Sequence, residues 1–284
     1  MPVDLTQSKQ QSSKLACPIC ALSLALIYNT RRCDNAHSFD VAKEGYINLL
    51  LPQHKASRDP GDSKSMVQAR SHFHDNEFYK PLAGAITNHL PTASSLADLG
   101  CGEGSYGRWF LELEPSLDYY GVDISRHGIR SAAKSLPNAA WLVASNWHLP
   151  LLDRSFDTAL TIFAPIDQTE LLRIVKPKGH WINVTPGSNH LAELRDCLYD
   201  TVADIDKHRA FEHWQAIDTQ RVTGTMNLDQ ADIGNLTNMT PYAWQADRDR
   251  LLALQSRDNM TISYDFVINL FSKRSQSESR SPSI

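Results

Sequence analysis

The sequence lacks any long hydrophobic run. Its longest apolar stretch, Ala21–Tyr28, is interrupted by Ser23 and is far shorter than the roughly 20 residues that a membrane-spanning helix needs. The N-terminal segment MPVDLTQSKQQSSK also lacks the apolar centre of a secretory signal peptide. These two absences predict a protein that neither spans a membrane nor is secreted, and they favour a cytoplasmic location.

Cysteine and positive charge are also scarce. The five cysteines are an odd and sparse set, which argues against a disulfide framework. The 28 basic and 32 acidic side chains give a net charge of −4, whereas proteins that bind nucleic acid without specificity usually carry positive charge. Residues 1–90 differ, because their 10 basic and 8 acidic side chains leave a net charge of +2. If a polyanion binds, this N-terminal third is the expected contact.

The pattern of the chain predicts a small module followed by a larger domain. Hydrophobic residues make up 42% of the sequence, enough for a sizeable core. We expect disordered ends at residues 1–14 and 276–284, because both are polar. Between them we expect a module at 15–51, a linker and helix at 52–90, and a main domain at 91–275.

From residue 96 onward, short apolar runs alternate with amphipathic stretches. The runs are Leu96–Leu99, Tyr119–Val122, Ala140–Val143, Thr158–Ile162 and Gly179–Val184, and the segments near 105–114, 126–136, 167–176 and 188–203 suit helices. This alternation predicts an α/β domain with a parallel sheet and helices on both faces. Two later runs, Arg221–Leu228 and Met260–Phe271, predict strands separated by a helical stretch at 229–256. Such an ending is more typical of a methyltransferase than of a plain dinucleotide-binding domain.

Three cysteines and one histidine form the pattern C-x2-C-x12-C-x3-H. They are Cys17, Cys20, Cys33 and His37. Zinc prefers a tetrahedron of thiolate and imidazole ligands, and the gap of 12 residues allows a hairpin to bring the second pair opposite the first. Four protein ligands leave no open position, so we expect a structural zinc that stabilises a module too small to fold on its own core. The alternative is three unrelated buried cysteines and a surface histidine.

A glycine-rich turn follows the first apolar run of the main domain. It contains Asp98, Gly100, Gly102, Glu103 and Gly104. The letters GEGSYG match the dinucleotide pattern GxGxxG, but they begin about three residues too late after the strand. The spacing D-x-G-x-G-x-G instead matches the turn that binds S-adenosylmethionine (SAM). Two carboxylates beside the turn suit the cationic SAM and would repel a pyrophosphate, so the sequence favours SAM.

Further features follow the next strands in the expected order. Asp123 ends the second run about 20–25 residues after the glycine turn, where an acid can bind both ribose hydroxyls. A helix N-cap is its alternative role, for which Ser125 competes. Ala144–Asn146 follows the third run, where the adenine edge would bind, and Phe163–Pro165 follows the fourth, where a methyl acceptor would lie.

Several longer motifs give the chain a resemblance to a known family. They are FDVAKEGYINLL from Phe39, QHK and SRDPGD within 53–62, LGCGEG at 99–104, VKPKGHW at 175–181, TPGSNHL at 185–191 and MTPYAW at 239–244. From about Cys17 to Phe271 the chain resembles the bacterial large-subunit (23S) rRNA guanine-N1 methyltransferases. It departs from them at Lys178, where a glycine is usual, and in its longer tails.

The resemblance implies a zinc module packed against a Rossmann-like, seven-stranded SAM-dependent methyltransferase domain. It implies methyl transfer to N1 of one guanine in an rRNA hairpin, and it suggests a homodimer. The four zinc ligands match those of the family. Gly102, Glu103, Tyr79 and His190 match its SAM-binding positions. Without the resemblance, Tyr79 would be interpreted as a core aromatic residue and His190 as the start of a helix.

The chemistry requires loss of the proton from guanine N1, so a general base or stabilisation of the negative O6 would help. Asp59, Asp62 and Asp167 are polar candidates, but each also suits a turn or cap, and we assign no catalytic base. Basic residues near the zinc module could contact phosphates: Arg31, Arg32, Lys43, Lys55 and Arg58.

Two other functions stay open at this point. One is a methyltransferase for a small molecule, in which zinc only braces the fold. The other is a non-catalytic zinc and RNA-binding factor with a vestigial SAM domain, against which the intact glycine turn argues.

Overall fold

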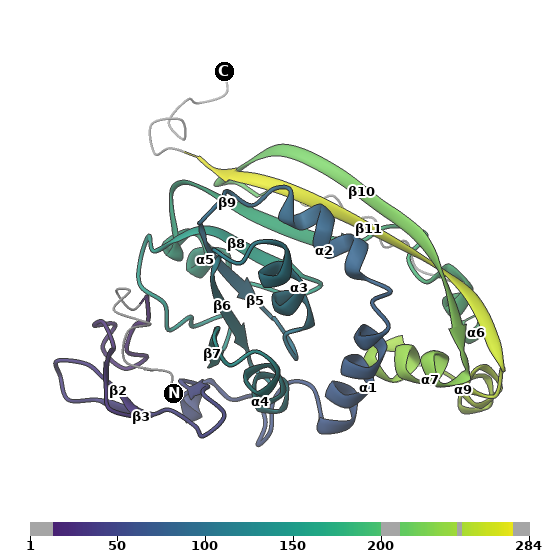
Figure 1. The fold of residues 1–284 in the computed structure, drawn as a ribbon, viewed down its shortest axis with the longest axis horizontal. Helices are drawn as coiled ribbons and strands as arrows, with labels where there is room; N and C mark the ends of the chain where they lie inside the picture. The colour runs from purple at the N-terminus through teal and green to yellow at the C-terminus, as the bar shows by residue number, and fades with distance from the viewer. Residues whose placement is uncertain (1–13, 200–210, 243–245, 275–284) are drawn as a thin grey trace, which may run out of the picture.

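The computed structural model describes residues 14–199, 211–242 and 246–274 (Figure 1). Of the ends predicted to be disordered, 1–14 and 276–284, all but Lys14 lie outside these residues, as does the last part of the helix predicted at 188–203; for Lys14 the prediction is wrong. Lys14 belongs to the folded part, because its ammonium group pairs with Asp118. No described helix combines the length and apolar character needed to cross a bilayer.

An eight-stranded mixed sheet forms the centre of the molecule, in the order β10-β11-β9-β8-β5-β6-β7-β4. Strands β5 to β9 are parallel, whereas β11 pairs antiparallel with β9 and β10 antiparallel with β11. The seven predicted strands are all present: β5 (Ser95–Leu99), β6 (Asp118–Asp123), β7 (Ala140–Val143), β8 (Phe156–Ile162), β9 (Val175–Pro186), β10 (Trp214–Asp229) and β11 (Asn259–Lys273). The α/β methyltransferase fold is therefore confirmed.

The eighth strand was not predicted. It is β4 (Ile47–Asn48), which lies in the predicted zinc module and pairs parallel with β7 at the edge of the sheet. The backbone N–H of Leu49 extends this pairing by donating to the Val143 carbonyl at 2.9 Å. The module therefore contributes to the main sheet itself.

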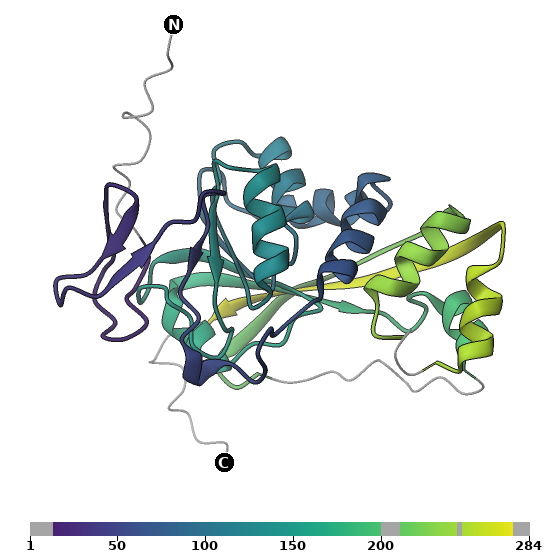
Figure 2. The ribbon, with the colours of Figure 1, turned by 90° about the horizontal axis from the view of Figure 1, so that it is seen from below.

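Helices cover the sheet as the alternation of the sequence predicts. They are α1 (Lys64–Asp75), α2 (Lys80–Thr87), α3 (Ser105–Leu113), α4 (Arg126–Ser135), α5 (Gln168–Ile174), α6 (Ala192–Leu198), α7 (Gln230–Met239) and α9 (Arg248–Gln255). Figure 2 shows α3 and α4 together on one side of the sheet. The long β10 and β11 strands extend beyond the other strands toward α7 and α9 (Figure 1).

Two predicted helical stretches are each broken in the structure. In the described part of the stretch at 229–256, α7 ends at Met239, two residues before Pro241, and Asp247 caps α9 through Asp249 N and Arg250 N. The stretch at 66–90 divides into α1 and α2 around Glu77, which has a left-handed φ of 57°.

Side-chain alternation along the strands builds two cores. Leu96 and Leu160 face the same side as Trp109 of α3 and Ile129 of α4. Their neighbours Ala97, Leu99 and Ala159 face the opposite side, where they pack with α5 and with the module residues Leu15, Leu24 and Cys33. Because successive residues of a strand point to opposite faces, one strand can serve both cores.

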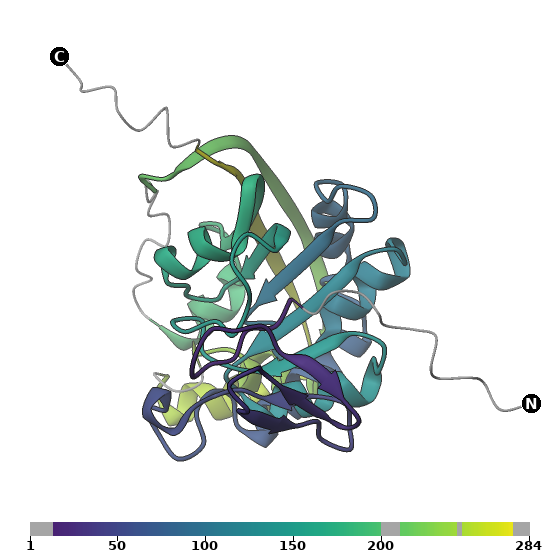
Figure 3. The same ribbon diagram turned by 90° about the vertical axis from the view of Figure 1, so that its left-hand side faces the viewer.

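The N-terminal module has its own small antiparallel sheet of β1 (Ala25–Ile27), β2 (Thr30–Arg32) and β3 (Ser38–Asp40). Figure 3 shows this sheet from the side of the module. Its contacts with the main domain include the Ala16 N–H, which donates to the Pro150 carbonyl at 2.9 Å, and Arg130, which pairs with Glu44 at 2.9 Å.

Gly121 in the central strand β6 tests how tightly this core is packed. A Cβ at Gly121 would lie 2.3 Å from the fully buried Trp141 ring, whereas a Cβ at Gly84 in α2 would meet nothing within 4 Å. We expect Gly121→Ala to lower the free energy of unfolding by about 1–3 kcal/mol through overpacking. We expect Gly84→Ala to raise it by about 0.5–1 kcal/mol, because alanine is the better helix former. Urea denaturation measures both, and equal midpoints for the two variants would contradict this packing.

Candidate metal centre and cofactor cavity

The four predicted zinc ligands lie together. Cys17 Sγ and Cys33 Sγ are each 3.5 Å from His37 Nδ1, and Cys20 Sγ is 3.6 Å from Cys33 Sγ. All four ligand atoms lie within 4.8 Å of one another. A tetrahedral zinc with bonds of about 2.3 Å to sulfur and about 2.0 Å to nitrogen sets its ligand atoms roughly 3.5–3.8 Å apart. The donor set and its spacing therefore fit a structural zinc.

Local backbone hydrogen bonds hold the two halves of the metal centre. The Ala21 N–H donates to the Cys17 carbonyl at 2.8 Å and closes the first turn, and the Ala36 N–H donates to the Cys33 carbonyl at 2.9 Å in the second. The β1–β2 hairpin lies between these turns and brings them opposite each other, as the 12-residue gap predicts.

Metal removal gives the test of this centre. We expect Cys20→Ser to bind about one zinc less per chain and to unfold at a lower temperature, because zinc supplies folding energy to small modules. Cys197→Ser is the matched control, because Cys197 lies on α6. Elemental analysis and thermal unfolding measure the two effects. Full zinc content in Cys20→Ser would contradict the ligand set.

A cavity of about 590 Å³ lies at the carboxyl ends of the parallel strands. This edge of a doubly wound sheet is the usual place for a ligand. Its wall contains all seven residues predicted to bind a cofactor: Tyr79, Asp98, Gly100, Gly102, Glu103, Asp123 and His190. The structure therefore brings together residues that are up to 111 positions apart in the sequence.

The glycine turn needs glycine at three positions. Gly100, Gly102 and Gly104 have φ angles of +89°, +58° and +84°, a region that side chains disfavour. A Cβ at Gly100 would lie 2.4 Å from the Cβ of Ala164. Gly104 is the N-cap of α3, so the turn delivers the chain directly into that helix.

Asp123 joins the end of β6 to the glycine turn. Its Oδ2 accepts from Gly102 N at 2.9 Å and its Oδ1 from Ser125 N at 2.7 Å. Burial raises the pKa of Asp123, while these two donors oppose the shift. Ser125 is the N-cap of α4, with its side chain accepting from Gly128 N, so the capping role considered for Asp123 belongs to Ser125. Each Asp123 oxygen keeps a lone pair for a ligand hydroxyl.

The two other carboxylates of the turn differ in charge. Burial alone would raise the pKa of Glu103, but the hydrogen bond and charge of His74 and the charge of Arg70 lower it to about 2. Burial raises the pKa of Asp98 to about 7, although the Tyr119 hydroxyl donates to its Oδ2 at 2.6 Å. Glu103 is therefore the firmly ionised group of the pair near neutral pH.

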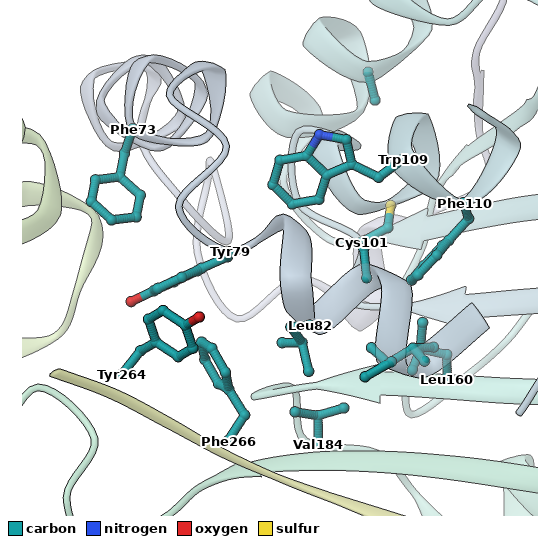
Figure 4. Close-up of a cluster of buried hydrophobic side chains, with 14 of the residues drawn as sticks. Phe73, Tyr79, Leu82, Cys101, Trp109, Phe110, Leu160, Val184, Tyr264 and Phe266 are labelled. Atoms are coloured by element: carbon teal, nitrogen blue, oxygen red, sulfur yellow. The ribbon is translucent and has the colours of Figure 1, made fainter. Parts of the chain in front are cut away.

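The rings of Tyr79 and His190 lie close together in the cavity wall. Their ring centroids are 6.2 Å apart, and the Tyr79 ring packs edge-on to Phe266 at 4.8 Å (Figure 4). Burial lowers the pKa of His190 to about 4, and its Nδ1 accepts from Asp265 N at 3.3 Å. Its proton therefore resides on Nε2 at neutral pH, which makes His190 a hydrogen-bond donor.

The three aspartates considered as bases have other partners. Asp167 caps α5 by accepting from Thr169 N and Glu170 N. Asp59 pairs with His127 at 3.0 Å and does not line the cavity. Asp62 does line it, but it pairs with Arg70.

The acceptor and adenine segments lie where the strand order predicts. Ser145, Asn146, Phe163 and Pro165 all line the cavity, and Asn146 Nδ2 donates to the Pro165 carbonyl at 3.0 Å. Trp147 and Phe163 expose 51% and 46% of their surface, so the cavity wall includes two accessible aromatic rings.

Several residues of the wall were not predicted from the sequence. They are Gly61, Arg70, His74, Tyr106, Trp147 and the segment Met239–Tyr242. Arg70 and His74 are four residues apart on α1 and so share one helix face, a signal the sequence does contain. Nothing in the sequence links that face to the glycine turn.

The candidate phosphate contacts are mostly accessible. Arg32, Lys43, Lys55 and Arg58 are exposed. Arg31 is half-buried, and its buried Nε has no hydrogen-bond partner among the described residues.

The buried His190 predicts a dependence of stability on pH. The unfolded chain takes up a proton at this histidine as pH falls through 6.5, whereas the folded protein does not until about pH 4. Stability therefore falls with pH in this window, by about 3 kcal/mol at pH 4 relative to pH 7. We expect His190→Gln to lack this loss, which denaturation curves at both pH values measure. If the stability of the wild-type protein fell between pH 7 and pH 4 by no more than that of the variant, the assigned neutral state of His190 would be contradicted.

Residues 15–58 match the zinc-ribbon family "RlmA, N-terminal", and residues 96–179 match the family "Methyltransferase domain". A 23S rRNA (guanine(748)-N(1))-methyltransferase of Streptomyces fradiae is 34% identical over 89% of this chain and 95% of its own. A putative 23S rRNA (guanine-N(1)-)-methyltransferase, YxjB, of Bacillus subtilis is 32% identical over 90% and 96%. A third, from Micromonospora griseorubida, is 30% identical over 84% and 90%.

Proposed function

The chain belongs to the family of 23S rRNA guanine-N1 methyltransferases, and from this premise we propose that it transfers a methyl group from SAM to N1 of one guanine in a 23S rRNA hairpin. The observation that carries the proposal is the cavity at the strand ends, where the glycine turn, Asp123 and an ionised Glu103 meet. The relative from Streptomyces fradiae matches over 95% of its own length, and residues 15–58 of this chain match the zinc-ribbon family.

The residues present fit SAM. Asp123 keeps lone pairs for the ribose hydroxyls, and the glycine turn allows a ligand to approach the backbone. Tyr79 Oη and Tyr106 Oη are buried and have no hydrogen-bond partner among the described residues. Buried polar atoms of this kind are rare in folded proteins, so they indicate a missing polar ligand.

The chain's own residues align the reactants and exclude water. SAM supplies a methyl group carried on a positive sulfur, and the transfer is an in-line displacement in which alignment is the main requirement. His190 lines the cavity and carries its proton on Nε2, so it is suited to donating to a negative oxygen rather than to proton abstraction. Each of the four carboxylates in the wall is ion-paired or hydrogen-bonded to α1, the glycine turn or β6. They are Asp62, Asp98, Glu103 and Asp123.

The target guanine must be unpaired when it reacts, because N1 lies on its Watson–Crick edge. The exposed rings of Trp147 and Phe163 offer apolar faces on which an extruded base can stack. The exposed basic residues of the module and its linker offer contacts to the hairpin backbone. We extend the proposal to a cytoplasmic homodimer, as the resemblance suggests, for which light scattering of the purified protein is the measurement.

Methylation of rRNA gives the direct test. We expect tritium from labelled SAM to enter 23S rRNA that lacks the modification, and nucleoside mass mapping to assign it to N1 of a guanine. We expect Asp123→Ala to lower kcat/KM by about 100-fold, since two hydrogen bonds to a charged group cost about 3 kcal/mol or more when lost.

The control is Asp167→Ala, because Asp167 only caps α5 outside the cavity. Transfer to a low-mass acceptor with none to rRNA would reject the proposal in favour of a small-molecule methyltransferase. Failure to bind SAM at all would favour a vestigial domain.

A further inference from the structure

The segment 187–191 joins β9 to α6 and folds back onto strand β11. The Gly187 N–H donates to the Asp265 carbonyl at 2.9 Å, and the Leu191 N–H donates to the Ser263 carbonyl at the same distance. Ser263 and Asp265 are alternate residues of β11. Two backbone hydrogen bonds to one strand therefore anchor both ends of the segment.

The carboxylate of Asp265 holds the middle of the same segment. Asp265 is 1% exposed, and its Oδ2 accepts from the Asn189 N–H at 3.0 Å. A Cβ at Gly187 would lie 2.4 Å from this oxygen, so only glycine allows so close an approach there. The Asp265 N–H donates to His190 Nδ1 at 3.3 Å. Asp265 thus contacts the segment through its carbonyl, its carboxylate and its N–H.

Arg221 of the neighbouring strand β10 holds the carboxylate from another direction. Its Nε donates to Asp265 Oδ1 at 2.6 Å, and its Nη2 pairs with Oδ2. Such a fork binds both carboxylate oxygens and fixes the orientation of the group. The hydrogen bonds from Arg221 lower the pKa of Asp265, so the carboxylate is ionised and can only accept. Arg221 Nη2 also donates to Ser188 Oγ at 3.3 Å, within the segment itself.

These contacts fix the ring of His190. A backbone N–H can only donate, so Nδ1 accepts from Asp265 and the proton of the neutral ring lies on Nε2. Aromatic rings enclose the imidazole, with the Phe266 centroid at 4.9 Å, Phe163 at 5.5 Å and Tyr79 at 6.2 Å. Figure 4 shows Phe266 and Tyr79 close together in this part of the core. The imidazole therefore has one held position and one held tautomer.

We propose that Asp265 is a positioning residue for methyl transfer, which acts through His190 and is itself held by Arg221. Neither Asp265 nor Arg221 is among the described residues that line the cavity, whereas His190 is. The pair keeps the Nε2 proton of His190 available in the cavity wall for an oxygen of the bound reactants. This inference rests on the proposed function, and neither the sequence motifs nor the resemblance identified these two residues.

Kinetics of rRNA methylation give the first test. We expect Asp265→Ala to lower kcat by about 100-fold, because a displacement of about 1 Å costs this much in an aligned reaction. Asp265→Asn keeps an acceptor for Asn189, and Arg221→Met keeps the carboxylate. We expect each of these two variants to lose only about tenfold.

The Michaelis constant separates positioning from substrate binding. The Arg221 side chain is 51% exposed, so contact with an RNA phosphate is its alternative role. A positioning role predicts that kcat and kcat/KM fall together while KM for rRNA changes by less than about twofold. A rise in KM for rRNA with unchanged kcat in Arg221→Met would assign it to RNA binding and overturn the inference.

The tautomer of His190 gives a readout that a purely structural role would not move. Nitrogen NMR of the histidine-labelled, zinc-loaded protein distinguishes the two ring nitrogens, and His190→Gln assigns the signals. We expect the Nε2–H tautomer in the wild type and in Asp265→Asn. We expect a mixture of both tautomers in Asp265→Ala, because the segment is no longer held at Asn189.

Thr219→Val is the matched control on the same pair of strands. It removes an exposed hydrogen bond from Thr219 Oγ1 to Asn269 Oδ1 of 3.2 Å, outside the cavity wall. We expect unchanged kcat and an unchanged His190 tautomer. A loss of activity equal to that of Asp265→Ala would reflect general weakening of the β10–β11 hairpin and would overturn the inference.

The remaining outcomes are also decisive. Lower stability in Asp265→Ala with unchanged kcat and tautomer would assign the ion pair a purely structural role and overturn the inference. If Asp265→Ala does not fold, Arg221→Met decides, since its unchanged kcat would have the same meaning. A wild-type protein that transfers no methyl group to rRNA would reject the proposed function, and the role of Asp265 in methyl transfer with it.

Discussion

One hydrogen bond organises the cofactor cavity: the backbone N–H of Gly102 donates to Asp123 Oδ2. It forms because β5 and β6 are parallel neighbours that end at the same edge of the sheet. It also requires the chain to turn back over the end of β6, which the left-handed glycines permit. The same turn presents Glu103 to α1, so the positions of Arg70 and His74 depend on it.

The zinc-binding module also contributes to the cofactor cavity. The turns that hold the ligands belong to a module whose strand β4 pairs with β7 and whose linker reaches the cavity. The Ser125 hydroxyl donates to the Asp62 carbonyl at 2.8 Å, and Gly61 packs directly on Ile124 and Ser125. The linker therefore builds one wall of the cavity as well as connecting two parts of the chain.

The sequence predicted those features whose signal is local. Apolar runs located the seven strands, and spacing alone located the four metal ligands, the glycine turn and Asp123. Tyr79 and His190 were found only through resemblance, because an isolated tyrosine or histidine has no spacing that marks it. The break at Pro241 could have been predicted, since proline ends helices.

The missed features depend on tertiary contacts. Strand β4 has two residues, too few to produce an alternating pattern. Arg70 and His74 reach the glycine turn only after α1 has packed beside it, and the raised pKa of Asp98 results from burial that no motif records. Some functional residues of the cavity can therefore be predicted from local sequence signals, whereas others depend on how the helices and strands pack.

The short strand β4 also has a consequence for any attempt to shorten the protein. It covers the outer hydrogen-bonding groups of β7, and the module covers the apolar face formed by Leu142 and Tyr120. A catalytic domain without its N-terminal module would expose the unpaired edge of β7 beside an apolar surface. Strands of other molecules can pair with such an edge, which leads to aggregation. The two residues of β4 therefore protect the edge of the sheet from edge-to-edge aggregation.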